Sequence, residues 1–182
     1  FKNRALILTL TNAGGSPIQF SPESQRLVTT RDDGLLIWNT RTWQQEGELP
    51  GAQEPFAFAR KGEVIVAPQN DHLALWSVPE PRKIADLPGT VSVSRLPSSI
   101  AVSPDGNRVF LSATNQIRAW DLRTQTELDA MISPKKIVLL SLAVSPEGLL
   151  VAAQNDGKVT LWDPGTRQLL HTLDRKSTRL NS

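Results

Sequence analysis

The chain has 182 residues, of which 39% are hydrophobic and 21% charged, and its formal net charge is +2. This composition favours a folded chain over a disordered one, and the absence of cysteine excludes disulfides, thiolate metal sites and cysteine nucleophiles. No apolar run is long enough for a membrane helix, and no secretory signal is visible.

The positive charge lies at the end of the chain. Residues 174–182 hold three basic residues and one acidic residue, which leaves 17 of the 20 basic and 17 of the 18 acidic residues elsewhere. The body is therefore neutral, which argues against nucleic-acid binding. Residues 174–182 resemble a sequencing adapter translated as protein, so we leave this tail out of the fold.

Five segments follow one another along the chain. Ala5 to Leu10 predicts a single strand, and four repeated units follow it at residues 17–49, 55–87, 99–131 and 141–173. The repeat is defined by tryptophans spaced 38, 44 and 42 residues apart, namely Trp38, Trp76, Trp120 and Trp162. An apolar anchor lies 18 residues before each of them, namely Phe20, Phe58, Val102 and Val144.

Each unit contains four short apolar stretches separated by turn signals, such as Ser103-Pro104-Asp105-Gly106. The second stretch passes through a residue seven positions after the anchor, namely Leu27, Ile65, Val109 or Val151. Both faces of the predicted strands are apolar, as expected for sheets covered on both sides by neighbours. We therefore predict an all-β fold: a β-propeller fragment of four four-stranded antiparallel blades plus one leading strand of a missing blade.

Two of the units carry a recognisable dipeptide. Trp120-Asp121 and Trp162-Asp163, which follow Ser-Pro-Asp-Gly and Ser-Pro-Glu-Gly turns, resemble the WD-repeat (WD40) β-propeller family. Asn39 and Ser77 replace this aspartate in the first two units, and no Gly-His pair occurs in the connecting loops. Such degenerate repeats are similar to bacterial members. On this reading the chain is part of a larger ring, whose remaining blades would cover the outer faces of the first and last units.

No catalytic, cofactor or metal site is predicted. His72 and His171 have no recognisable nucleophile motif nearby. The Asp32-Asp33-Gly34 stretch lacks the spacing of a calcium loop and reads as a turn. Trp43 is the one tryptophan outside the repeat, and we expect it to pack against its hairpin rather than stack on a ligand.

A protein or peptide partner is expected on one rim of the ring. The turns between the second and third strands share this rim with the loops that join successive units, and only these loops vary in length. The other rim should keep turns of fixed length. The candidate binding residues are Arg31, Asp32, Gln69, Asn70, Asn115 and Asn155 from the turns and Arg95, Lys135 and Lys136 from the two long loops.

Two functions are compatible with this pattern. The first is a non-catalytic propeller that acts as a protein-interaction scaffold. The second follows from a resemblance to propellers fused to bacterial serine/threonine protein kinases, carried by phrases such as Trp120-Asp121-Leu122-Arg123-Thr124. In that case the chain would be a C-terminal regulatory or sensor module whose catalytic domain precedes Phe1.

Overall fold

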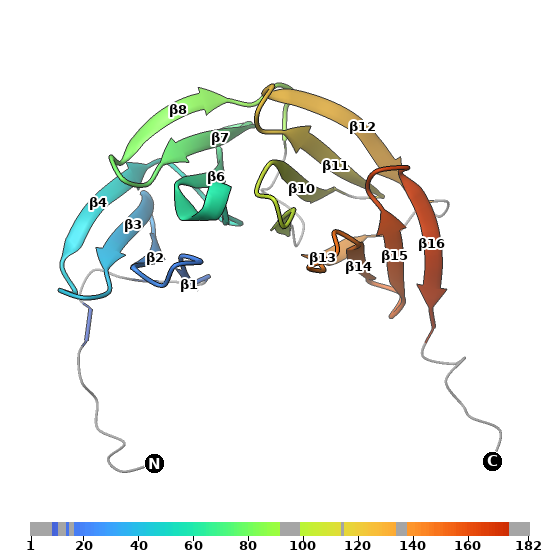
Figure 1. Cartoon of the computed structure of the whole chain (residues 1–182), viewed down its shortest axis with the longest axis horizontal. Helices are drawn as coiled ribbons and strands as arrows, with labels where there is room; N and C mark the ends of the chain where they lie inside the picture. The colour runs from blue at the N-terminus through green and yellow to red at the C-terminus, as the bar shows by residue number, and fades with distance from the viewer. Residues whose placement is uncertain are drawn as a thin grey trace, which may run out of the picture.

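Four antiparallel β-sheets form the part of the chain that the computed structural model describes, which comprises residues 9–10, 14, 17–91, 99–113, 115–133 and 138–174. Each sheet has four strands in sequence order, and the sheets follow one another along an arc whose outside is formed by the fourth strands (Figure 1). The predicted all-β fold of four four-stranded antiparallel blades is confirmed. Most of the predicted leading strand lies outside the described residues.

The strands are short and joined by tight turns. The first sheet contains β1 (Gln19–Phe20), β2 (Arg26–Arg31), β3 (Gly34–Asn39) and β4 (Gln45–Pro50). The second contains β5 (Ala57–Ala59), β6 (Val64–Gln69), β7 (His72–Ser77) and β8 (Arg82–Asp86), with a 3-10 turn, η1 (Arg60–Gly62). The third contains β9 (Ile100–Val102), β10 (Arg108–Ala113), β11 (Gln116–Asp121) and β12 (Thr126–Ile132). The fourth contains β13 (Leu139–Val144), β14 (Leu150–Gln154), β15 (Val159–Asp163) and β16 (Gln168–Leu173).

A separate apolar core fills each space between neighbouring sheets. Trp76 belongs to the core shared with the first sheet, Trp120 to the core shared with the second, and Trp162 to the core shared with the third. Each of these three tryptophans therefore faces the preceding sheet, whereas Trp38 of the first sheet packs with Leu27, Leu36 and Leu10. Because the two middle sheets lie between two such cores, they are apolar on both faces, as the sequence pattern requires.

The four repeat indoles differ in their hydrogen bonds. Trp38 and Trp162 donate from Nε1 to the hydroxyls of Thr29 and Thr160, both at 3.0 Å. Trp120 donates to the backbone carbonyl of Pro88, in the loop between the second and third sheets, at 2.9 Å. The buried Nε1 of Trp76 has no acceptor among the described residues. The constant tryptophan therefore donates to a threonine hydroxyl in two sheets, to a loop carbonyl in the third, and to no described acceptor in the second.

The fourth sheet has a different register from the other three sheets. In the third sheet the anchor Val102 pairs with Val109, seven residues later, whereas in the fourth sheet Val144 pairs with Leu150, six residues later. Leu150 is fully buried and Val151 is only partly buried. The predicted second strand does pass through Val151, but Leu150 takes the position that pairs with the anchor.

The register changes because the two turns beside β14 differ in length from their counterparts. The turn before β14 is closed by a hydrogen bond from Ser145 N to Leu149 O at 2.8 Å and is one residue shorter than the corresponding turn before β10. The turn after β14 is longer, and Gln154 N donates to Lys158 O at 2.9 Å across it. The two changes cancel before Trp162, so a constant anchor-to-tryptophan spacing conceals them. Turn length on the two rims is consequently not constant, contrary to the prediction.

The aspartates that follow two of the tryptophans stabilise the turn between the third and fourth strands. Asp121 Oδ1 accepts hydrogen bonds from the backbone N–H groups of Arg123 and Thr124, at 2.8 and 3.1 Å. Asp163 accepts one from Gly165 N at 2.7 Å and one from the hydroxyl of Thr166 at 2.9 Å. These bonds lower the pKa of both carboxyl groups below the ordinary aspartate value, chiefly through Thr124 N–H for Asp121 and the Thr166 hydroxyl for Asp163.

The lowered pKa values predict a loss of stability in acid. The unfolded chain binds protons near pH 3.8, before the folded chain does, so the stabilisation is complete above that pH and is lost as the pH falls through the lower folded-state pKa values. Asn39 accepts the same backbone bonds, from Arg41 N and Thr42 N at 2.8 and 3.0 Å, without titrating. In urea unfolding followed from pH 7 to about pH 2, the variant Asp121→Asn/Asp163→Asn should lose stability less steeply than the unaltered chain. Identical pH profiles would contradict this role.

No helix within the described part of the chain is long and apolar enough to cross a membrane. Large apolar side chains are exposed on the first and fourth sheets, namely Phe20, Leu140, Leu170 and Leu173, together with Ile18 directly before β1.

Candidate interaction surface

One rim of the arc is formed by the β2–β3, β6–β7, β10–β11 and β14–β15 turns and by the loops that connect the sheets. The two kinds of segment are bonded to each other through the main chain. Gly51 N donates to Asp33 O at 2.7 Å, and Val91 N donates to Asp71 O at 2.6 Å. We call this side the linker rim, and it contains the described candidate residues.

Arg31 and Asp32 lie at the β2–β3 turn and differ in their contacts. Arg31 Nη2 forms ion pairs with Asp33, at 2.9 Å, and with Glu48, at 3.3 Å. The hydrogen bond from Arg31 lowers the pKa of Asp33 below its ordinary value. Asp32 is exposed and has no hydrogen bond or ion pair with any described residue. Its carboxylate therefore remains available to a partner, whereas the charge of Arg31 is largely matched.

Gln69 and Asn70 lie at the β6–β7 turn. Gln69 Nε2 donates to the carbonyl of Pro50 at 2.9 Å, which connects the second sheet to the end of the first. Asn70 is exposed and has a φ of 56°, a left-handed conformation that asparagine tolerates better than most residues. Gln69 thus positions the neighbouring loop, and Asn70 forms the tip of the turn.

Asn115 and Asn155 also hold loops in place. The carbonyl of Asn115 accepts a hydrogen bond from Ser133 N at 2.9 Å, at the start of the loop to the fourth sheet. Asn155 binds the end of that loop twice, because its N–H donates to Val138 O at 3.0 Å and its Oδ1 accepts from Val138 N at 3.2 Å. Arg95, Lys135 and Lys136 lie outside the described residues.

The structure brings no catalytic arrangement together in the described residues. His72 Nδ1 lies 2.6 Å from Asp71 Oδ1, and both side chains are exposed at the tip of the β6–β7 turn. His171 lies in β16 and is exposed. Among the described residues, no group of three or more histidine or acidic side chains is arranged to hold a metal ion.

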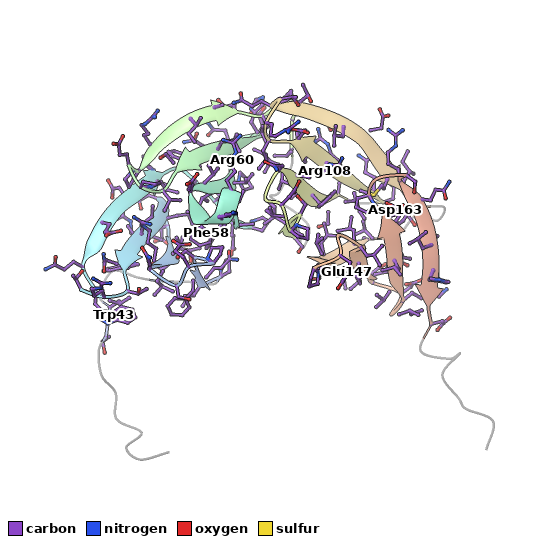
Figure 2. The ribbon with its side chains drawn as sticks, in the orientation of Figure 1. Trp43, Phe58, Arg60, Arg108, Glu147 and Asp163 are labelled. Carbon is purple, nitrogen blue, oxygen red and sulfur yellow. The ribbon has the colours of Figure 1, made fainter. Side chains whose placement is uncertain are left out.

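The contacts of the opposite rim were not predicted from the sequence. This rim is formed by the turns between the first and second strands and between the third and fourth strands of each sheet. Arg60 of η1 donates from its guanidinium to Leu122 O at 2.5 Å, and its backbone N–H donates to Gly106 O at 3.3 Å, so the second and third sheets are joined there (Figure 2). The only signal for this contact was the loss of the Ser-Pro turn at Ala59-Arg60-Lys61-Gly62. Arg60, which replaces the proline of the repeated turn, thus makes the contact between the two sheets.

No protein-family model matches the sequence, and no curated protein matches it. Solved structures do match. A chain of Kuenenia stuttgartiensis hydrazine synthase superposes with a TM-score of 0.75 at 16% identity, over 94% of this chain and 52% of that chain. The present chain thus spans about half the length of its structural neighbour. At this identity the likeness shows the fold alone, because one fold supports many functions.

Proposed function

We propose that the chain is a non-catalytic β-propeller of the WD-repeat type that acts as a scaffold for protein interactions. The observation that carries the proposal is that each loop between two sheets is hydrogen-bonded to both of them. The first loop binds the first sheet through Gly51 N and the second through Gln53 N, which donates to Pro68 O at 2.7 Å. The second loop binds Asp71 on one side and the Trp120 indole on the other.

The third loop, between the third and fourth sheets, is also hydrogen-bonded to both of its neighbouring sheets. Its start is bonded to Asn115 of the third sheet and its end to Asn155 of the fourth. Loop ends held in this way lose little conformational entropy when a partner binds, which is how a scaffold gains affinity from several short contacts. The WD-repeat assignment is supported by the turn-capping role of Asp121 and Asp163 and by the threonine hydroxyls that accept from Trp38 and Trp162.

The test compares one substitution on each rim. Asp32→Lys reverses an exposed charge on the linker rim that has no partner among the described residues, and Glu80→Lys makes the same change at an exposed position of the β7–β8 turn on the opposite rim. In affinity capture from a lysate of the source organism, quantified by mass spectrometry, Asp32→Lys should lower the yield of a bound protein roughly tenfold, equivalent to about 1.4 kcal/mol. Glu80→Lys should leave the yield unchanged. Equal yields from both variants would contradict binding through the linker rim.

A further inference from the structure

Two residues in adjacent turns of the first sheet have unfavourable backbone conformations. Ser24, in the β1–β2 turn, has a φ of 57°, whereas the corresponding residues of the other sheets are glycines, namely Gly62, Gly106 and Gly148, with φ of 95°, 72° and 89°. Glycine adopts this left-handed region without steric cost, and serine does not. The first sheet therefore keeps a side chain at a position where the other three have none.

Trp43 is the second such residue. It lies in the β3–β4 turn with a φ of 58°, and the equivalent residues Gln125 and Arg167 have φ of 56° and 63°. The shared φ shows that this conformation belongs to the turn geometry, and the first sheet differs in placing a large aromatic side chain there. Trp43 is 39% exposed, whereas the four repeat tryptophans are at most 7% exposed. Its indole thus offers an apolar surface at the end of the arc (Figure 2).

A polar hollow lies where these two turns meet. It has a volume of about 460 Å³ and is lined by Ser24, Gln25, Asn39, Thr40 and Arg41. Thr40 holds the two turns together, because its N–H donates to Gln25 O at 3.0 Å and its hydroxyl donates to Ser24 O at 2.7 Å. The hollow is therefore a built feature of the first sheet rather than a gap between loosely placed loops.

Arg41 is the one charged side chain among the residues that line the hollow. Arg41 has no ion pair or hydrogen bond from its side chain to any described residue. The nearby carboxylates are already paired: Glu46 with Arg26 at 3.0 Å and Glu23 with Arg26 at 3.7 Å. A guanidinium with five unpaired N–H groups matches a carboxylate best.

We propose that this hollow, together with Trp43, binds an acidic peptide segment of a partner protein, with a carboxylate on Arg41 and an adjacent apolar side chain on the Trp43 indole. The proposal rests on the proposed function as an interaction scaffold, but it places the contact on the rim opposite the linker rim. Exposed tryptophan and arginine are the side chains most often responsible for binding energy at protein interfaces. Because Gln125 and Arg167 share the left-handed φ of Trp43, the exposed indole rather than the backbone conformation distinguishes the first sheet.

The first arm of the test measures stability. Trp43→Gly and Ser24→Gly should each raise Tm by about 2–4 °C, because glycine relieves the left-handed strain. Gln125→Gly makes the same replacement at the equivalent position of the third sheet and should raise Tm by a similar amount. A lower Tm for Trp43→Gly than for the unaltered chain would show that the indole serves packing and would overturn the proposal.

The second arm measures binding of a fluorescein-labelled pool of nine-residue peptides that alternate glutamate with leucine, phenylalanine or valine. The unaltered chain should bind this pool, and the affinity should fall at least tenfold in both Trp43→Gly and Arg41→Gln. Gln125→Gly should bind normally, and a matched pool with lysine in place of glutamate should not bind. Bound peptide should also protect Trp43 from acrylamide quenching.

The outcomes separate this proposal from the proposed function. Failure of the unaltered chain to bind the acidic pool, or equal binding by Trp43→Gly and Gln125→Gly, would overturn the acidic-peptide site. Neither result would alter the comparison of Asp32→Lys with Glu80→Lys, which tests the linker rim. Equal binding of the lysine pool would show contact with exposed apolar surface rather than recognition of a carboxylate, and would also overturn the site.

Discussion

Gly106→Ala is expected to lower the free energy of unfolding by about 3–5 kcal/mol, from the left-handed backbone cost together with the steric overlap. Gly106 has a φ of 72° in the turn before β10. A Cβ at this position would lie 2.6 Å from the backbone nitrogen of Arg60 and 2.9 Å from its Cα, in the neighbouring sheet. Neither backbone atom can move without disturbing the hydrogen bond from Arg60 N to Gly106 O.

Gly148→Ala is the matched control for this prediction. Gly148 occupies the same position of the fourth sheet with a φ of 89°, and a Cβ there would meet no atom within 4 Å. It should therefore show only the backbone cost of about 1–2 kcal/mol. Urea unfolding of the two variants separates the conformational cost from the contact between sheets. Equal destabilisation would show that the second and third sheets do not touch closely at Gly106.

Trp120→Ala is expected to cost about 3–5 kcal/mol of folding stability, the usual range for removing a large buried aromatic side chain. Trp120 is fully buried in the core between the second and third sheets. Its indole also donates to Pro88 O, and the guanidinium of Arg118 lies 4.8 Å from the ring centre. The substitution therefore removes core volume together with one of the hydrogen bonds that attach the second loop.

Phenylalanine substitutions separate these two contributions. Trp120→Phe keeps much of the side-chain volume but leaves Pro88 O without the indole donor. It should therefore cost more folding stability than the corresponding change in the second sheet, Trp76→Phe. Trp76→Phe removes a buried N–H that has no acceptor among the described residues, which offsets part of the lost packing. In urea unfolding Trp120→Phe should be destabilised by about 1–2 kcal/mol more than Trp76→Phe. A reversed order would contradict the role of the Pro88 hydrogen bond.

The candidate residues on the linker rim were predictable in position but not in role. Turn signals such as Asn155-Asp156-Gly157 locate a turn because their backbone preferences are local. Whether a turn side chain is free depends on which loop lies beside it. Gln69 and Asn155 were predicted as binding residues, and both hold a neighbouring loop through hydrogen bonds. Asp32 has no such neighbour among the described residues, so it remains the clearest candidate.

The amino-acid sequence by itself determined the number of sheets, their four-stranded antiparallel form and their apolar faces, because strand periodicity and turn chemistry are local properties. Only the tertiary structure decided the one-residue shift at Leu150, since two compensating turn lengths leave the spacing between Val144 and Trp162 unchanged. It also decided the acceptor of each indole and the exposure of Trp43. The Trp120–Pro88 contact joins residues 32 positions apart in the chain, and a repeated local pattern does not encode contacts of that kind.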